Sequence, residues 1–190
     1  GGYGQCLALN IPDLGGKTPP ERGQVLCAAG YLEASTVFHA RLNAVPGLER
    51  PLRNAEEVKL HTGTAEEPAK VYLLENSVLT EGAPAFATVV TQAPVAATVR
   101  DRLILRRASP AETVAGGEIL AVDPPGARTR KKQALERLKA QAAFFRGVDP
   151  DSETGLDRTV EWFLVSDRPQ GAAAADIAKG AMLAPDVVAA

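Results

Sequence analysis

The residues best suited to chemistry gather in one stretch of the chain, Leu103 to Leu120, with the sequence LILRRASPAETVAGGEIL. The paired arginines offer planar cationic forks that suit phosphate oxygens. The paired glycines lack a Cβ, so another backbone can come close to them, and the serine and threonine add hydroxyls. The candidate phosphate-binding residues are Arg106, Arg107, Ser109, Thr113, Gly116 and Gly117. The alternative is an ordinary surface hairpin with solvated arginines.

A β-hairpin would position these residues. The runs Leu103 to Leu105 and Glu118 to Val122 are both strand-like, and Ser-Pro and Gly-Gly dipeptides lie between them. We therefore expect two antiparallel strands whose connecting loop carries the arginines, the hydroxyls and the glycines.

Positive charge is concentrated in and after this hairpin. The chain has a net charge of −2, and acidic residues outnumber basic ones from Glu33 to Val99. From Arg100 to Arg146 the balance reverses, and this part includes the basic run Arg128 to Lys132. A double-stranded RNA arm is read mainly through its phosphates and 2′-hydroxyls, which arginines and a glycine-rich turn suit. A solvated helix face is the alternative for Arg128 to Lys132.

Other kinds of chemistry find little support in the sequence. His39 and His61 are the only histidines, and neither has a Cys or Asp pattern with metal-ligand or catalytic spacing. Glu66 and Glu67 are adjacent, so in a strand they point to opposite faces and cannot share a proton. No GxxxxGK[ST] sequence, the phosphate-binding loop of P-loop proteins, is present. We therefore expect no GTP site, no metal site and no enzymatic activity in this chain.

Short strands separated by turns occupy the middle of the chain. The expected strands are Val37 to Val45, Val58 to Thr62, Ala69 to Leu74, Ala85 to Val90 and the two strands of the hairpin. Phe38, Ala40 and Leu42 alternate with more polar residues, as expected of a strand with one buried face. Six strands with almost no helical period predict a mainly β fold. An antiparallel barrel is expected because closure removes the exposed edges of a small sheet.

A helical period replaces the strand pattern after Pro125. Residues Ala127 to Arg146 predict an amphipathic helix that ends at Gly147. Its expected apolar face consists of Ala134, Leu135, Leu138, Ala142 and Phe145. Asp149 to Gly155 then has the composition of a polar linker.

A second helix is expected to begin at Asp157, with Trp162 and Phe163 in a core. Two short helices are expected after it, from Ala172 to Met182 and from Pro185 onward. This order of helices is typical of the start of a winged-helix domain.

The first part of the chain has a strand pattern of its own. Strands are expected at Cys6 to Ile11 and at Gln24 to Ala29. Such a pair cannot bury a core alone, so we expect it to be the tail of a preceding barrel, with Cys6 and Cys27 as reduced core thiols. The chain starts without methionine and stops inside an expected helix, so we expect a fragment of a longer protein. No apolar run approaches the roughly 18 residues of a membrane helix, so no membrane contact is expected.

In four motifs, in the same order, the chain resembles selenocysteine-specific elongation factors (SelB). The hairpin is similar to the end of the family's third domain, where a Leu-Arg strand leads to Ser-Pro, Thr, a glycine cluster and Asp-Pro-Pro. The matching positions are Arg106, Ser109, Pro110, Thr113, Gly116, Gly117, Asp123, Pro124 and Pro125. The other three motifs are His61 to Glu66, Pro51 to Arg53 and Arg22 to Leu26. The resemblance covers roughly Gly4 to Pro125.

The resemblance implies an elongation-factor-type barrel and four parts in the chain. Residues 1–32 would be the C-terminal strands of a preceding translation-factor barrel, domain II, and residues 33–125 the barrel of domain III. Residues 126–148 would form a basic connecting helix, and residues 149–190 the truncated start of a winged-helix domain.

The resemblance also implies a function. SelB proteins are cytoplasmic translational GTPases that carry selenocysteinyl-tRNA to the ribosome at recoded UGA codons. This portion would contact the tRNA arms and lead to C-terminal winged helices, absent here, that read a hairpin in the selenoprotein mRNA. GTP and Mg²⁺ would bind in an N-terminal domain that is also absent. Two alternatives are the tRNA-binding barrel of another elongation-factor-Tu-like GTPase and a protein-interaction barrel whose basic hairpin only docks a GTPase domain.

The expected RNA-binding set extends beyond the hairpin. By resemblance, the turn that contains His61 and Thr64 would face RNA, and the charge distribution adds Arg130 and Lys131. Glu112 departs from the family pattern, which often has a basic residue there, and an acid facing phosphate would be repulsive. Either Glu112 points away from the RNA, or binding relies on the two arginines and the loop backbone.

Overall fold

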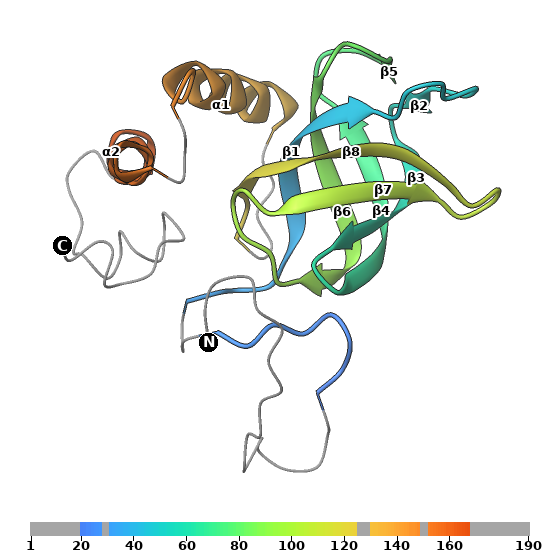
Figure 1. The fold of residues 1–190 in the computed structure, drawn as a ribbon, viewed down its shortest axis with the longest axis horizontal. Coiled ribbons are helices and arrows are strands. Elements are labelled where there is room, and N and C mark those ends of the chain that lie inside the picture. The colour runs from blue at the N-terminus through green and yellow to red at the C-terminus, as the bar shows by residue number, and fades with distance from the viewer. Residues whose placement is uncertain (1–19, 28–30, 125–129, 149–151, 168–190) are drawn as a thin grey trace.

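A closed antiparallel β-barrel forms the centre of the computed structural model, which describes residues 20–27, 31–124, 130–148 and 152–167 (Figure 1). Its strands run in the order β1-β6-β4-β3-β7-β8, and the short strands β2 and β5 pair separately. The strands are β1 Ser35–Ala44, β2 Leu52–Arg53, β3 Glu56–Thr62, β4 Ala65–Leu73, β5 Val78–Leu79, β6 Ala85–Val95, β7 Arg102–Arg107 and β8 Glu112–Val122. The mainly β, closed-barrel fold is therefore confirmed.

The alternation of side chains along the strands explains the barrel core. In β1, Phe38, Ala40 and Leu42 are fully buried, whereas Arg41 and Asn43 face outward and are exposed. In β7, Leu103 and Leu105 are buried and the residues beside them are exposed. Each inward row thus faces the inward rows of the other strands, and burial of this apolar surface is the main term that stabilises the barrel.

His39 departs from this pattern, because it faces outward on β1 and is nevertheless buried. Its Nδ1 lies 3.0 Å from Thr88 Oγ1 on β6, and its Nε2 lies 3.2 Å from Asp123 Oδ2, just after β8. The Ser35 hydroxyl donates a hydrogen bond to the Asp123 carbonyl oxygen at 2.6 Å. These contacts connect Asp123, just after β8, to strand β1, and His39 of β1 to β6.

Helix α1, Lys131–Phe144, packs against the outside of the barrel (Figure 1). Ala134 and Leu138 are buried with Leu74 and Ala121, as the apolar period predicts. Ala142 is exposed, contrary to the predicted apolar face, and the buried residue there is Gln141. The Gln141 amide donates a hydrogen bond to the Leu120 carbonyl oxygen at 2.9 Å, so β8 provides a polar partner for this face of the helix.

Helix α2, Glu153–Asp167, begins earlier than the predicted start at Asp157. The Ser152 hydroxyl accepts a hydrogen bond from the Gly155 N–H at 3.0 Å, which is the geometry of a helix N-cap. Part of the expected polar linker is therefore the first turn of the helix. The other part lies outside the described residues, as do the expected helices after Arg168.

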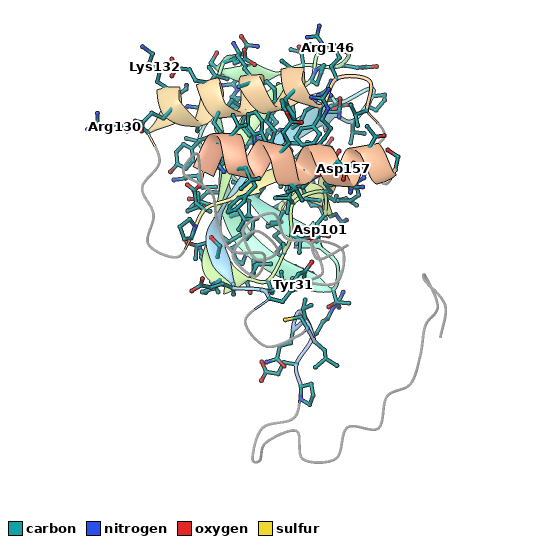
Figure 2. All side chains as sticks on the ribbon, turned by 90° about the vertical axis from the view of Figure 1, so that its left-hand side faces the viewer. Tyr31, Asp101, Arg130, Lys132, Arg146 and Asp157 are labelled. Carbon is teal, nitrogen blue, oxygen red and sulfur yellow. The ribbon has the colours of Figure 1, made fainter. Side chains whose placement is uncertain are left out.

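The two helices contact each other through aromatic side chains. Trp162 of α2 lies 5.3 Å from Phe144 and 6.3 Å from Phe145, centroid to centroid. Phe163 is buried, as predicted, whereas Trp162 is only partly buried. In Figure 2, α1 and α2 lie side by side, with Arg130 and Lys132 near one end of α1 and Arg146 near the other. No helix in the described part of the chain is long and apolar enough to cross a membrane.

The segment 20–27 differs from its prediction. Residues 24–27, the described part of the expected strand from Gln24 to Ala29, are not in a strand. Val25 and Leu26 are 51% and 68% exposed, and Cys27 is an exposed free thiol rather than a core residue. In the described residues this segment has no neighbouring strand to cover its apolar side chains, which is the physical reason for the difference. Cys6 and the strand expected there lie outside the described residues.

Candidate nucleic-acid interface

The outward side chains of β3, β7 and β8 form one continuous surface, which we call the outer face. Strand β7 lies between the other two, so Arg106 pairs with Lys59 on one side and with Thr113 on the other. Ile104 pairs in the same way with His61 and with Gly116. The outer face consists of Lys59, His61, Arg102, Ile104, Arg106, Thr113, Gly116 and Glu118.

Of the two predicted hairpin arginines, Arg106 is the one that the structure leaves available to a phosphate. Its side chain is exposed at the middle of the outer face, between Lys59 and Thr113. Within the described residues it makes no ion pair or side-chain hydrogen bond. Its guanidinium can therefore contact an anion without giving up an existing partner.

Arg107 has a different role from the predicted one. Its side chain is 2% exposed and points away from the outer face, because adjacent residues of a strand face opposite sides. Its Nε donates a hydrogen bond to Glu56 Oε1 at 2.6 Å, and its Nη1 donates one to Glu112 Oε2 at 2.8 Å. Its Nη2 donates to the Arg50 and Pro51 carbonyl oxygens at 2.8 and 3.2 Å. Arg107 is thus an internal anchor and not a phosphate ligand.

The same contacts account for Glu112. Its carboxylate is turned toward Arg107 across the hairpin, in an ion pair of 2.8 Å. The acid therefore neutralises an internal arginine, and its position does not oppose an anion at Arg106. Of the two possibilities left open by the sequence, the structure has Glu112 directed to the anchor.

One carboxyl group in contact with this anchor, that of Glu56, has a shifted pKa. Burial alone would raise the pKa of Glu56, but hydrogen bonds from Arg107 and the Arg53 N–H, with the charges of Arg107 and Arg50, hold it below its ordinary value. The hydrogen bond to Glu56 raises the pKa of Arg107 in turn. On the outer surface, the hydrogen bond from Lys59 lowers the pKa of Glu66. The anchor therefore remains fully charged at neutral pH.

The glycines lie in strand β8 and not in the hairpin loop as predicted. The turn consists of residues 108–111, so that Ser109 is at the exposed tip and Thr113 is exposed just inside β8. Gly116 pairs with Ile104 and Asn43, and Gly117 pairs with Leu103 and Leu42. Strand β8 extends further toward the turn than its glycines indicated, because it is held between β1 and β7.

The predicted residues on β3 and its turn lie at the side and end of the outer face. His61 is partly buried, with Nδ1 3.9 Å from Glu66 Oε2. The Thr64 hydroxyl accepts a hydrogen bond from the Gly23 N–H at 3.2 Å, and its carbonyl oxygen accepts one from Arg22 Nε at 3.3 Å. Thr64 thus holds the segment 20–27 against the barrel, while His61 faces outward beside Ile104.

Arg130 and Lys131 are separated from the hairpin residues. They are exposed at the start of α1, and Figure 1 shows α1 on the opposite side of the barrel from the β7–β8 turn. Arg130 and Lys131 therefore do not belong to the outer face that carries Arg106. The sequence did not single out Lys59, Arg102 or Ile104, although strict alternation along β3 and β7 places them beside Arg106.

The described part of the chain contains no group of three or more His, Cys, Asp or Glu residues that could hold a metal ion. The outer face offers cationic, hydroxyl and apolar contacts on a sheet.

Comparison with known proteins places this barrel in a family. Residues 39–126 match the family model described as the β-barrel domain of selenocysteine-specific elongation factor. A selenocysteine-specific elongation factor of Desulfomicrobium baculatum is 34% identical over 124 residues, which cover 65% of this chain and 19% of that protein. The one from Escherichia coli (strain K12) is 29% identical over 139 residues, covering 73% and 21%. The chain thus spans about a fifth of the length of these relatives.

Among solved structures, a crystal structure of sup35 complexed with GDP is similar, with a TM-score of 0.43 and 20% identity. The match covers 48% of this chain and 26% of that one. The sequence match defines residues 39–126 as a β-barrel domain of the kind found in translation elongation factors. Within that class, this barrel is the one of the selenocysteine-specific elongation factor (SelB) family.

Proposed function

We propose that this chain is the part of a SelB-type translational GTPase that contacts an arm of selenocysteinyl-tRNA through the outer face of β3, β7 and β8. The parent factor would deliver that tRNA to the ribosome at recoded UGA codons. Winged helices beyond the barrel would engage the selenoprotein mRNA. GTP and Mg²⁺ would be bound by a domain of the parent, because this chain carries no P-loop sequence.

One observation carries the proposal. Arg106 is exposed on the outer face and makes no ion pair within the described residues, although it belongs to a family barrel whose members are named for selenocysteine-specific elongation. Lys59 and Arg102 lie near it on the same surface, and each already has a carboxylate neighbour at 2.7 and 3.6 Å. Of these three cations, Arg106 would thus gain a new ion pair on contact with a phosphate. Lys59 and Arg102 would exchange a carboxylate partner for a phosphate.

A salt titration of RNA binding tests this proposal. The 190-residue chain would be titrated with a labelled selenocysteine tRNA transcript at several salt concentrations. Arg106→Gln should weaken binding and reduce the slope of log K against log salt by about 0.7–0.9, the value of one lost phosphate contact. Arg146→Gln is the matched control, because Arg146 is exposed and lies at one end of α1 (Figure 2), and α1 is on the opposite side of the barrel from the β7–β8 turn (Figure 1). We expect the Arg146→Gln slope to equal that of the parent chain.

Two results would favour the other classes. Equal affinity for selenocysteine tRNA and an elongator tRNA would favour a general elongation-factor-Tu-like barrel. Absence of RNA binding, or an Arg106→Gln slope equal to the parent's, would contradict RNA contact at this face and favour a barrel that docks a protein domain.

A further inference from the structure

Gly116 and Gly117 are neighbours on β8, but the fold constrains them in different ways. A Cβ added to Gly117 would collide with the Arg41 carbonyl oxygen and would lie 3.0 Å from Leu42 Cδ2. The barrel wall therefore requires glycine at residue 117, where β8 pairs with β1. The packing of the barrel is therefore sufficient to explain why residue 117 is glycine.

No such requirement exists at Gly116. A Cβ added there would meet only the Leu103 carbonyl oxygen, at 3.8 Å, which is an ordinary van der Waals contact. Gly116 is absent from the positive-φ glycines of the described residues, so its backbone conformation suits any L residue. Glycine weakens a strand because it loses the most conformational freedom on folding and has no side chain to pack. The fold alone would therefore favour another residue at this position.

The surroundings of Gly116 indicate what approaches it. Gly116 lies between Asn43 of β1 and Ile104 of β7, both of which face outward and are exposed. We call these three residues the Gly116 surface. With no side chain at its centre, the sheet is bare between Asn43 and Ile104, so a partner can reach the backbone itself.

Cations flank the Gly116 surface along β7. Arg106 lies on one side of Ile104 and Arg102, which is 82% exposed, lies on the other. The outer wall of the closed barrel, with cations on both sides of a bare centre, complements a polyanion whose surface is wide and shallow. The minor groove of an RNA duplex has that shape and presents 2′-hydroxyls and sugar edges between its phosphates.

We propose that the Gly116 surface is the point of closest approach between the barrel and the sugar–phosphate backbone of the RNA arm. Arg106 and Arg102 contact phosphates on either side of it, and Ile104 packs on a sugar. This proposal rests on the proposed function. It adds that the missing side chain at Gly116, where the fold does not need glycine, contributes to RNA affinity by letting the RNA backbone come close.

The test compares three glycine variants of the full chain in thermal unfolding and RNA binding. Gly116→Ala and Gly116→Val should keep or raise the thermal midpoint, since the fold has room for both and a β-branched residue suits a strand. Their affinity for the selenocysteine tRNA transcript should fall in the order of side-chain size. For Gly116→Val we expect a loss of about tenfold or more, equivalent to about 1.4 kcal/mol per tenfold. Gly117→Ala is the matched control and should lower the thermal midpoint.

The outcomes separate this inference from the proposed function. If Arg106→Gln weakens binding while Gly116→Val binds like the parent chain, RNA contacts the outer face but not the Gly116 surface, and the inference is wrong. If neither variant changes RNA affinity, the proposed function fails first. A fall in the thermal midpoint of Gly116→Ala similar to that of Gly117→Ala would also overturn the inference, because the fold itself would then need the glycine.

Discussion

At the scale of single residues, two adjacent arginines of the same hairpin have opposite roles. Arg106 faces outward without a partner in the described residues, and Arg107 is buried with two carboxylates and two carbonyl oxygens. Strand alternation places the two side chains on opposite sides of the sheet. Arg106 is therefore available to a ligand, whereas Arg107 is held by contacts within the fold.

This division predicts different effects of the same substitution. Arg107→Met should lower the free energy of unfolding by about 3 kcal/mol, because it leaves Glu56 and Glu112 without their shared cation. Arg106→Met should change it by less than about 0.5 kcal/mol, as expected for an exposed side chain without partners. Urea unfolding followed by circular dichroism would measure both values. Equal effects of the two substitutions would contradict the assignment of Arg107 as the anchor.

At the scale of elements, α1 is attached to the barrel by a small set of contacts. Leu138 is fully buried, Gln141 is hydrogen-bonded to the Leu120 carbonyl oxygen, and Lys139 lies 2.7 Å from Glu75. The apolar contacts outweigh the ion pair, because exposed pairs contribute at most about 1 kcal/mol. The helix is therefore held on the barrel mainly by its buried apolar residues.

Truncation of Leu138 should release the helix. Leu138→Ala is expected to cost about 2–5 kcal/mol of local stability. Hydrogen exchange should then show loss of amide protection in α1, while the strands of the barrel keep theirs. Lys139→Ala is the matched control one residue away and should leave exchange in α1 within about a factor of ten of the parent. Uniform loss of protection in barrel and helix would mean that the two do not unfold separately.

At the scale of the whole molecule, Glu56 connects several elements. Its carboxylate accepts hydrogen bonds from Arg107 of β7 and from the Arg53 N–H of β2, and Arg50 lies 3.3 Å from it. Since the pKa of Glu56 in the folded protein is below its ordinary value of 4.5, folding favours the ionised form. The stability from this shift is fully present above the unfolded pKa and is lost as the pH falls through the lower, folded value.

The acid side of the stability curve should report this connection. We expect the free energy of unfolding of the parent chain to decrease as the pH falls below about 4.5, and Glu56→Gln to flatten that decrease. At neutral pH, Glu56→Gln should lower the free energy of unfolding by about 1.5–3 kcal/mol, the value of a hydrogen bond to a charged group. Urea unfolding at a series of pH values would measure both. Glu57→Gln, at an exposed neighbouring position, is the matched control, and an equally flattened curve for it would argue against Glu56.

The sequence alone was enough for the barrel, the helix after it and the family. Period-two burial in β1 and β7 and the four family motifs are local patterns, and local patterns can be read directly from the order of residues. Phe38, Ala40 and Leu42 face the core as predicted because alternation along one strand depends only on that strand.

Only the tertiary structure decided which residues of the hairpin are exposed on the outer face and which are buried. The burial of Arg107 depends on Glu56, which is distant in the sequence, and on where β8 begins, which its pairing with β1 and β7 determines. The same pairing places both glycines in strand β8 and not in the turn. It also makes their roles differ, since the fold requires glycine at residue 117 and not at residue 116. Sequence patterns contain the side-chain chemistry, but the direction of each side chain follows from strand register, and register is a property of the closed barrel.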